Sequence, residues 1–279
     1  MIKLGQYNLL TINRFTDHGA YLDAGKDLGE ILLPKAFVKS EMRPGTQVEV
    51  IVYFDQQDRL VATTEKALAC VGDFAHLRVA WVNEHGAFLH WGPMKDIFVP
   101  FREQKLRMMK DHSYLVHIHI DDETARIVAS AKIERYIENA QPTDYHRGEV
   151  VDMLIWQKTD LGFKVIVNNR HQGLIYDNQV YTPLRSGMRL EGTVVKVRTD
   201  GKIDLSVQRI GKGRFKDFAE ELLEELKSAP DGFLPFTDKT ASDDIVARFG
   251  QSKKTFKKAV GTLYRERLIT IEDNGIRLC

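Results

Sequence analysis

The sequence of 279 residues has little of several features that would each point to a class of protein. It has only two cysteines, Cys70 and Cys279, which excludes a disulfide-rich scaffold and the paired spacing of a zinc site. No apolar run approaches the roughly 20 residues that a membrane helix needs. The opening residues, MIKLGQYNLL, lack the apolar core and cleavage site of a signal peptide. We therefore expect a cytoplasmic protein that has no membrane partner.

An excess of charge of one sign is also lacking, since the formal net charge is +1. A nearly neutral chain is not a strong nucleic-acid binder over its whole length. The charge is unevenly distributed, however. Residues 137–214 carry 12 basic and 9 acidic side chains, whereas residues 215–230 carry 2 basic and 5 acidic ones. Residues 231–279 have 9 basic and 7 acidic side chains, so a phosphate backbone would be attracted to the third quarter and the end of the chain.

The sequence does contain an internal repeat. HGAYL at residues 18–22 returns as HGAFL at residues 85–89, and a looser copy, LGFKV, stands at residues 161–165. Each copy precedes a second short apolar segment: GEILLP, KDIFVP or QGLIY. Such a repeat predicts an array of one small β-rich unit, and it favours a binding protein over one large catalytic domain.

Alternating apolar residues and β-branched side chains predict five strands in each unit. The predicted strands are 7–15, 19–24, 29–34, 46–54 and 59–65; then 75–82, 86–91, 96–100, 113–120 and 125–131; then 148–156, 162–167, 172–176, 189–197 and 202–207. Five strands with a break after the third are typical of the OB-fold Greek-key barrel, which binds oligonucleotides and sugars on its second and third strands. We expect such barrels over residues 1–67, 68–136 and 145–212.

After residue 214 the hydrophobic period becomes helical. An acidic segment carries a helical stripe made of Phe215, Phe218, Leu222, Leu223 and Leu226. SDDIVARFG (242–250) predicts a helix with Ser/Asp caps and a terminal glycine, and SKKTFKKAVGTLYRERLI (252–269) predicts a second helix. ITIEDNGIRL (269–278) predicts a hairpin with its turn at Asn274-Gly275. This order predicts a winged helix-turn-helix domain over residues 215–279, so the fold is expected to be mainly β with a C-terminal α+β module.

Several motifs resemble those of known domains. GKIDLSVQR (201–209) is similar to the closing strand of the S1-type RNA-binding domain, and HGAYL and HGAFL resemble its second strand. Together with KTDLGFKVIVNNRHQGLIY (158–176) and DDIVARFGQSKKTFKKAVGTLYRERLI (243–269), they give a resemblance to the conserved virulence factor B family over essentially the whole chain. The resemblance implies three S1-like barrels, a winged helix, RNA binding and post-transcriptional regulation of gene expression. It implies no catalysis and no cofactor.

The chain departs from the general S1 pattern, most of all in its first two units. The aromatic residue that usually precedes the second-strand glycine is replaced by His18, His85 and Leu161 in the three units. A histidine usual at the end of the third strand is replaced by proline in units one and two, while Tyr176 stands near that position in unit three. The closing arginine is present as Arg209. Units one and two are therefore expected to bind RNA weakly, or to act as spacers or protein-docking modules.

Single-stranded RNA is held by aromatic side chains that stack on bases and by cations that contact phosphate. The candidate RNA-binding residues of the third unit are Phe163, Lys164, Arg170, Tyr176, Arg198 and Arg209. The weaker candidates, on the equivalent face of the first two units, are His18, Tyr21, His85 and Phe88. The alternative is that the aromatic residues belong to the barrel cores and that the arginines are ordinary surface side chains.

Four lysines, Lys253, Lys254, Lys257 and Lys258, are spaced to share one broad face of the last predicted helix. This is the helix that enters the major groove in DNA-binding helix-turn-helix proteins, so the lysines complete the set of nucleic-acid-binding candidates. Such a run is equally typical of a solvated helix surface.

No motif predicts a metal site or an active site. His112, His117 and His119 are close in sequence, but no Asp, Glu or Cys at ligand spacing accompanies them within the strand, which favours a surface or pairing role. GKGR (211–214) lacks the length and the ending of a phosphate-binding loop. No nucleophile, base and orienting group can be assembled from the motifs. We therefore expect no cofactor, no metal and no small-molecule substrate.

The leading hypothesis is a non-enzymatic RNA-binding protein that regulates gene expression post-transcriptionally, with single-stranded RNA bound by the third barrel and the winged helix. One alternative is a winged-helix transcriptional regulator that binds duplex DNA. Another is a scaffold whose near-neutral first two units recruit a protein partner of RNA metabolism, such as a ribonuclease or a ribosomal component.

Overall fold

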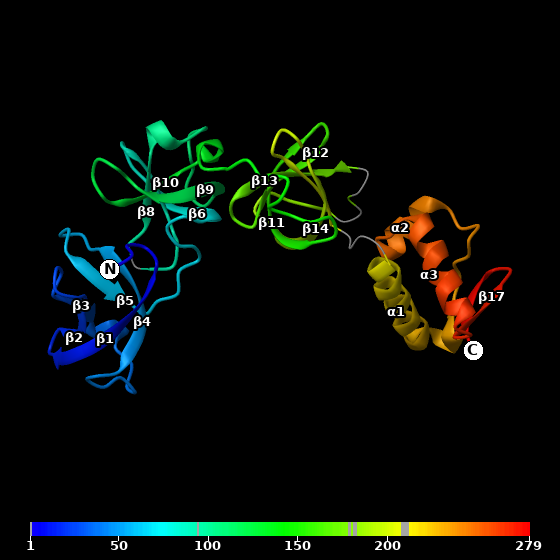
Figure 1. Ribbon diagram of the computed structural model, residues 1–279, viewed down its shortest axis with the longest axis horizontal. Helices are drawn as coiled ribbons and strands as arrows, with labels where there is room; N and C mark the ends of the chain where they lie inside the picture. Colours follow the sequence, from blue (N-terminus) through cyan, green and yellow to red (C-terminus); the bar gives the residue numbers. More distant parts are fainter. Residues whose placement is uncertain (1, 94, 178–179, 181–182, 208–211) are drawn as a thin grey trace. The chain divides into compact units, whose positions relative to one another are not determined.

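The strands predicted from sequence form three five-stranded barrels in the computed structural model, which describes residues 2–93, 95–177, 180, 183–207 and 212–279 (Figure 1). Barrel 1 consists of β1 (Tyr7–Thr16), β2 (Gly19–Asp23), β3 (Glu30–Pro34), β4 (Gln47–Phe54) and β5 (Leu60–Thr63). Barrel 2 consists of β6 (Phe74–Val82), β7 (Gly86–Leu89), β8 (Ile97–Pro100), β9 (Ser113–Ile120) and β10 (Ile127–Ser130). Barrel 3 consists of β11 (Val150–Thr159), β12 (Gly162–Val167), β13 (His171–Tyr176), β14 (Arg189–Val197) and β15 (Ile203–Ser206).

All three barrels share one topology. The third and fifth strands pair in parallel, the other neighbours are antiparallel, and the fourth strand returns to the first. The spatial order in each barrel is therefore first, second, third, fifth, fourth. This confirms the predicted OB-fold architecture. The chain divides into two compact units, Met1–Ile137 and Glu138–Cys279.

The C-terminal region is the predicted winged helix. It consists of α1 (Lys212–Ser228), β16 (Phe233–Leu234), α2 (Ser242–Phe249), α3 (Lys253–Arg265), β17 (Ile269–Glu272) and β18 (Gly275–Leu278). Two details differ from the prediction. The hairpin turn falls at residues 273–274, because Glu272 pairs with Gly275. The N-cap of α2 is Ala241, which offers no capping side chain. Among the described residues, no helix is both long enough and apolar enough to cross a membrane.

A glycine begins the second strand of every barrel because the third strand approaches it closely. A Cβ atom at Gly19, Gly86 or Gly162 would lie 2.0–2.3 Å from a backbone carbonyl oxygen of the facing strand. Gly19 and Gly162 also have φ angles of +142°, which side-chain-bearing residues rarely adopt. The glycine of the sequence repeat is therefore a backbone requirement of the barrel.

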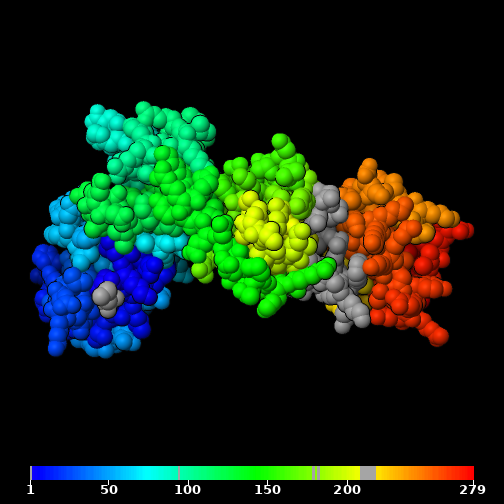
Figure 2. All heavy atoms as spheres, turned by 45° about the horizontal axis from the view of Figure 1, so that its top comes forward, coloured from blue at the N-terminus to red at the C-terminus, as the bar shows by residue number. Residues whose placement is uncertain are grey.

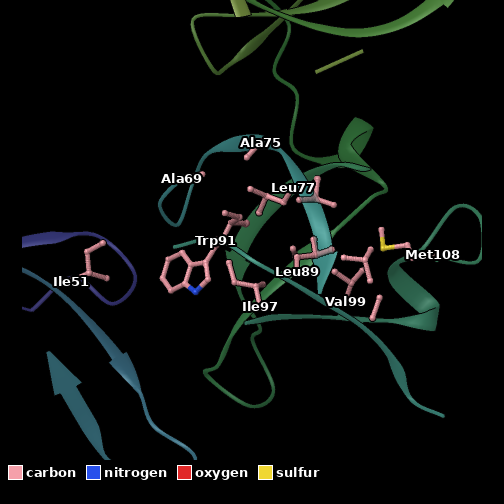
Figure 3. Packing of buried hydrophobic residues seen from close by; sticks show 14 residues of the cluster. Ile51, Ala69, Ala75, Leu77, Leu89, Trp91, Ile97, Val99 and Met108 are labelled. Carbon is pink, nitrogen blue, oxygen red and sulfur yellow. The ribbon is translucent and has the colours of Figure 1, made fainter. Parts of the chain in front are cut away.

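The two barrels of the first unit share a packed interface. The apolar core of barrel 2 includes Ile51 of β4, and Figure 3 shows the Trp91 ring at the edge of this core nearest to Ile51. The Lys95 ammonium donates hydrogen bonds to the carbonyl oxygens of Phe54 and Asp55 in barrel 1, at 2.9 and 2.8 Å. In Figure 2 the first barrel, in blue, meets the second, in cyan to green, without a gap. Barrels 1 and 2 therefore pack against each other as parts of one compact unit.

Two of the histidines considered above lie on one face of β9 against Tyr136. The His117 side chain is 9% exposed and its ring stacks on that of Tyr136, with 4.0 Å between the centroids. The Tyr136 hydroxyl is 3.2 Å from Nε2 of His119. Among the described residues, Nδ1 of His117 and Nδ1 of His119 are buried without a hydrogen-bond partner. Burial, followed by the neighbouring His119, lowers the pKa of His117 to about 4.

The close approach at the glycines can be tested in barrel 2. We expect Gly86→Ala to lower the free energy of unfolding by about 3 kcal/mol or more, because the new methyl group meets backbone atoms. The control is Gly72→Ala, where φ is +97° but open space surrounds the position, so only backbone strain of about 1–2 kcal/mol is added. Denaturant unfolding of the full chain measures both. A cost for Gly86→Ala no greater than that for Gly72→Ala would contradict the close approach.

The lowered pKa of His117 predicts acid sensitivity. The folded state favours the neutral ring, so the stabilisation is fully present above the ordinary pKa of about 6.5 and is lost as the pH falls towards 4. We expect His117 to lower the free energy of unfolding by about 2–3 kcal/mol between pH 7 and pH 4. In denaturant unfolding, His117→Phe should lose less stability over this range than the parent, whereas replacement of the exposed His18 by Ala should behave like the parent. The same pH dependence in all three would exclude this role.

Candidate nucleic-acid interface

Barrel 3 brings three of the predicted residues to one outer face, here called the barrel 3 face. Side chains of β12 alternate, so that Phe163 and Val165 point into the barrel and Lys164 points outward. Tyr176 ends β13 directly opposite Gly162. Arg198 follows β14, and its guanidinium donates a hydrogen bond of 2.8 Å to the Tyr176 hydroxyl. The barrel 3 face therefore presents a half-buried aromatic ring and two cations.

A buried carboxylate fixes the arginine of this face. Nε of Arg198 donates to Oδ1 of Asp204 at 2.7 Å, and the Asp204 side chain is buried. This hydrogen bond raises the pKa of Arg198 further above its usual range. Nζ of Lys196 lies 3.6 Å from the same carboxylate. Because Asp204 holds the guanidinium, the charge next to Tyr176 is positioned before any ligand arrives.

A tryptophan that sequence reasoning missed lies next to Lys164. Nζ of Lys164 is 5.1 Å from the ring centroid of Trp156, whose side chain is buried. The register of β11 against β12 shifts between Ile155 and Gln157, so Trp156 sits in a bulge. Asp204 was missed as well, although its place as a polar residue between apolar neighbours in KIDLSV could have marked it.

The structure corrects the expectation that Phe163 shares this outer face. Its side chain is 8% exposed and belongs to the core of barrel 3. Nζ of Lys158 lies 4.6 Å from the centroid of the Phe163 ring and covers it. The alternative interpretation, that this phenylalanine is a core residue, is the correct one.

The register of the repeats gives the physical reason. Gly19, Gly86 and Gly162 each pair with the last residue of the third strand. Counted from these glycines, Phe163 takes the place of the buried alanines of HGAYL and HGAFL, and Lys164 takes the place of their aromatic residue. Consecutive side chains of a strand point to opposite faces, so a shift of one position moves the aromatic ring into the core.

Two other candidates lie elsewhere. Arg170 is in the turn between β12 and β13, at the far end of β12 from Gly162, and forms an ion pair of 2.8 Å with Glu138. Arg209 lies outside the described residues. The structure therefore places Arg170 away from the barrel 3 face.

In the first unit, the weaker candidates are divided between turns and strands. His18 and His85 are exposed in the turns before β2 and β7. Tyr21 and Phe88 occupy equivalent positions on the outer faces, each paired with a residue of the first strand. The Arg14 guanidinium lies 4.1 Å from the Tyr21 centroid. The Phe88 ring stacks on Trp81 with 3.6 Å between centroids and 6° between planes.

The lysines of α3 lie opposite its apolar face. The buried side of this helix consists of Thr255, Phe256, Ala259, Val260 and Leu263. Lys254, Lys257 and Lys258 are exposed and Lys253 is half-buried; Nζ of Lys257 is 3.6 Å from Asp238. The hydroxyl of Ser252 caps the helix by accepting a hydrogen bond from the Thr255 amide. The first turn holds two lysines and no acidic residue, an arrangement that the helix dipole disfavours and that a nearby phosphate would favour.

Comparisons with known proteins agree with this architecture. The model of the CvfB-like winged helix domain matches residues 220–278, and the model of the S1 domain matches residues 4–65. The S1 match thus falls on barrel 1, whereas the sequence motifs had pointed to barrel 3 as the unit most similar to S1. The motif-based resemblance to conserved virulence factor B is confirmed.

Similar proteins cover most of the chain. YitL of Bacillus subtilis is 27% identical over 282 residues, which is 98% of this chain and 93% of that protein. Conserved virulence factor B of Staphylococcus aureus is 22% identical over 246 residues, which is 85% of this chain and 81% of that protein. A crystal structure of a multidomain protein with nucleic acid binding domains from Streptococcus pneumoniae is 24% identical, with a TM-score of 0.42, covering 99% of this chain and 98% of that one.

The Arg198–Asp204 pair generates a stability prediction. We expect Asp204→Asn to cost about 1–3 kcal/mol, because it leaves a half-buried guanidinium without its charged partner. Asp200→Asn is the control, since Asp200 pairs with Lys202 on the surface and such pairs contribute at most about 1 kcal/mol. Both variants are compared by denaturant unfolding. Equal, small effects would show that Asp204 does not hold the arginine.

Proposed function

Because this chain is a relative of YitL and conserved virulence factor B that carries an S1 domain and a CvfB-like winged helix domain, we propose that it is a cytoplasmic RNA-binding protein without catalytic activity. OB-type barrels and winged helices are nucleic-acid-binding architectures. In this proposal the protein acts on gene expression after transcription, by occupying single-stranded regions of RNA.

The observation that carries the proposal is the barrel 3 face. It places the half-buried ring of Tyr176, the fixed guanidinium of Arg198 and the ammonium of Lys164 on the second and third strands and the edge next to them. A protein ring can stack on a base only if the face of that base is not covered by neighbouring bases. Single-stranded RNA offers such bases, whereas the bases of a duplex are stacked on one another. The two cations would then contact the phosphates on either side of that base.

The winged helix supports the same proposal as a second source of phosphate contacts. Lysine is a point charge and not a planar fork, so a lysine-rich face suits the phosphate backbone better than the edge of a particular base. Because both domains belong to one chain, binding by one raises the effective concentration of the other near the same strand. From these residue types we expect α3 to bind phosphates with little sequence preference. We expect barrel 3 to add stacking on a base.

Fluorescence anisotropy of the full chain with short single-stranded RNA, single-stranded DNA and duplex DNA tests the proposal. We expect RNA to be bound best, and we expect Tyr176→Ala to weaken RNA binding roughly 5- to 100-fold, the effect typical of losing a stacking aromatic. Lys164→Ala should weaken it less and should reduce its salt dependence by about one phosphate contact.

The control is Arg147→Ala, which removes one positive charge from an exposed position just before β11. It should leave the affinity within about twofold, since Arg147 lies at the opposite end of β11 from the Thr159–Gly162 pair next to the barrel 3 face, and a distant surface charge is largely screened. Unchanged affinity in Tyr176→Ala would exclude the barrel 3 face as the binding site. Tighter binding of duplex DNA than of RNA would favour a transcriptional regulator.

A further inference from the structure

A half-open pocket of about 730 Å³ lies where barrels 1 and 2 meet within the first unit. One wall comes from β7, β8 and β10 of barrel 2, and the other comes from Tyr53 and Phe54 at the end of β4 in barrel 1. Sites for small ligands typically have volumes of about 300–1,000 Å³. The pocket therefore has room for one molecule of the size of a nucleotide.

The walls of this inter-barrel pocket are aromatic. Phe88, Phe98 and Phe101 line it together with Trp91. Phe88 is supported from outside the pocket by the stacked ring of Trp81, and it lies 4.9 Å from Phe98, centroid to centroid. Rings that are already packed against one another lose little conformational freedom on binding. Such walls select a flat, unsaturated ligand.

The polar groups that line the pocket include cations and carboxylates, and among the cations Arg102 is our candidate for binding an anionic group. The Arg102 side chain is 64% exposed, and its guanidinium lies 3.5 Å from Asp121 and 3.9 Å from Glu123. Asp96 lines the pocket and accepts a hydrogen bond of 3.0 Å from the indole of Trp81. A ligand with both an anionic group and ring-bound amino groups would match this pairing of a cation with acceptors.

The two walls are held together by contacts between the barrels. Besides the hydrogen bonds from Lys95 to the end of β4, Arg126 forms an ion pair of 2.6 Å with Asp58. Lys95 and Arg126 both line the pocket. The pocket is thus formed before binding, and neither barrel could make it alone.

We propose that this inter-barrel pocket binds a single nucleotide, with its base against the Phe88 and Phe98 rings and its phosphate at Arg102. The pocket opens on the outer face of β7 and β8, the strands equivalent to those of the barrel 3 face, but here an aromatic ring stands where barrel 3 has Lys164. The same chemistry is offered by a free mononucleotide and by one unstacked nucleotide of an RNA strand. In either case barrels 1 and 2 form one binding site.

Isothermal titration calorimetry of the full chain with AMP, GMP, CMP and UMP tests the pocket, alongside the RNA anisotropy assay. We expect Arg102→Ala to weaken binding about tenfold through the lost phosphate contact, and Phe98→Leu to weaken it roughly 5- to 100-fold through lost stacking. Arg78→Ala and Tyr114→Leu are the controls, because they remove an exposed arginine and a half-buried aromatic of barrel 2 outside the pocket. Because Arg102 is exposed, its variant tests the proposal even if Phe98→Leu destabilises barrel 2.

The outcomes separate the two sources of the nucleotide. If mononucleotides bind and both pocket variants weaken that binding, the pocket is a site for a free nucleotide. This result would support the proposal even if the chain bound no RNA. RNA binding that the pocket variants weaken, without mononucleotide binding, supports it with a nucleotide of the strand. Affinities for all ligands that are unchanged in Arg102→Ala and Phe98→Leu would overturn it.

Discussion

The three barrels depend on a close backbone contact between the second and third strands, which only a glycine permits. At Gly162 this contact leaves Tyr176 facing bare backbone, so that its ring and the Arg198 guanidinium have room on the outer surface. At Gly86 a Cβ atom would lie 2.7 Å from the Phe98 ring and would displace a wall of the inter-barrel pocket. One backbone requirement therefore closes the barrels and also shapes both candidate binding sites.

The same constraint explains which parts of the fold could be predicted. Strands, their order and the helices of the winged domain followed from local periodicity, since each depends on residues that are neighbours in sequence. The face on which a side chain lies depends on register, which shifts by a full face for every residue. The three copies align at their glycines, but Phe163 was chosen as a stacking residue because it is aromatic, although it directly follows Gly162 and belongs to the core. Counting residues from the glycine would have assigned Phe163 to the inner face and Lys164 to the outer face.

Other features could not be predicted because they join residues that are distant in sequence. Arg198 reaches Tyr176 because β15, which pairs with β14, also lies in parallel beside β13. The inter-barrel pocket combines the end of β4 with β7 and β8, and no pattern within one repeat records a contact between two repeats. Tyr136 meets His117 for the same reason. In each case the local pattern indicates the face of the strand on which a side chain lies. The residue that it contacts depends on which strands the fold brings together.

The near-zero net charge has a consequence for the proposed function. A chain with a large positive charge would bind any polyanion through the release of counterions, with affinity falling steeply as salt rises. Here acidic residues balance nearly all the cations, and those of the candidate sites are placed individually. A buried carboxylate holds Arg198, and Lys253 and Lys254 stand in the first turn of α3, where the helix dipole disfavours them. With few phosphate contacts available, stacking on fixed rings has to supply much of the binding energy. The protein would then distinguish nucleic acids by whether their bases are free to stack. Single-stranded segments would be bound in preference to duplex, despite the greater charge density of duplex.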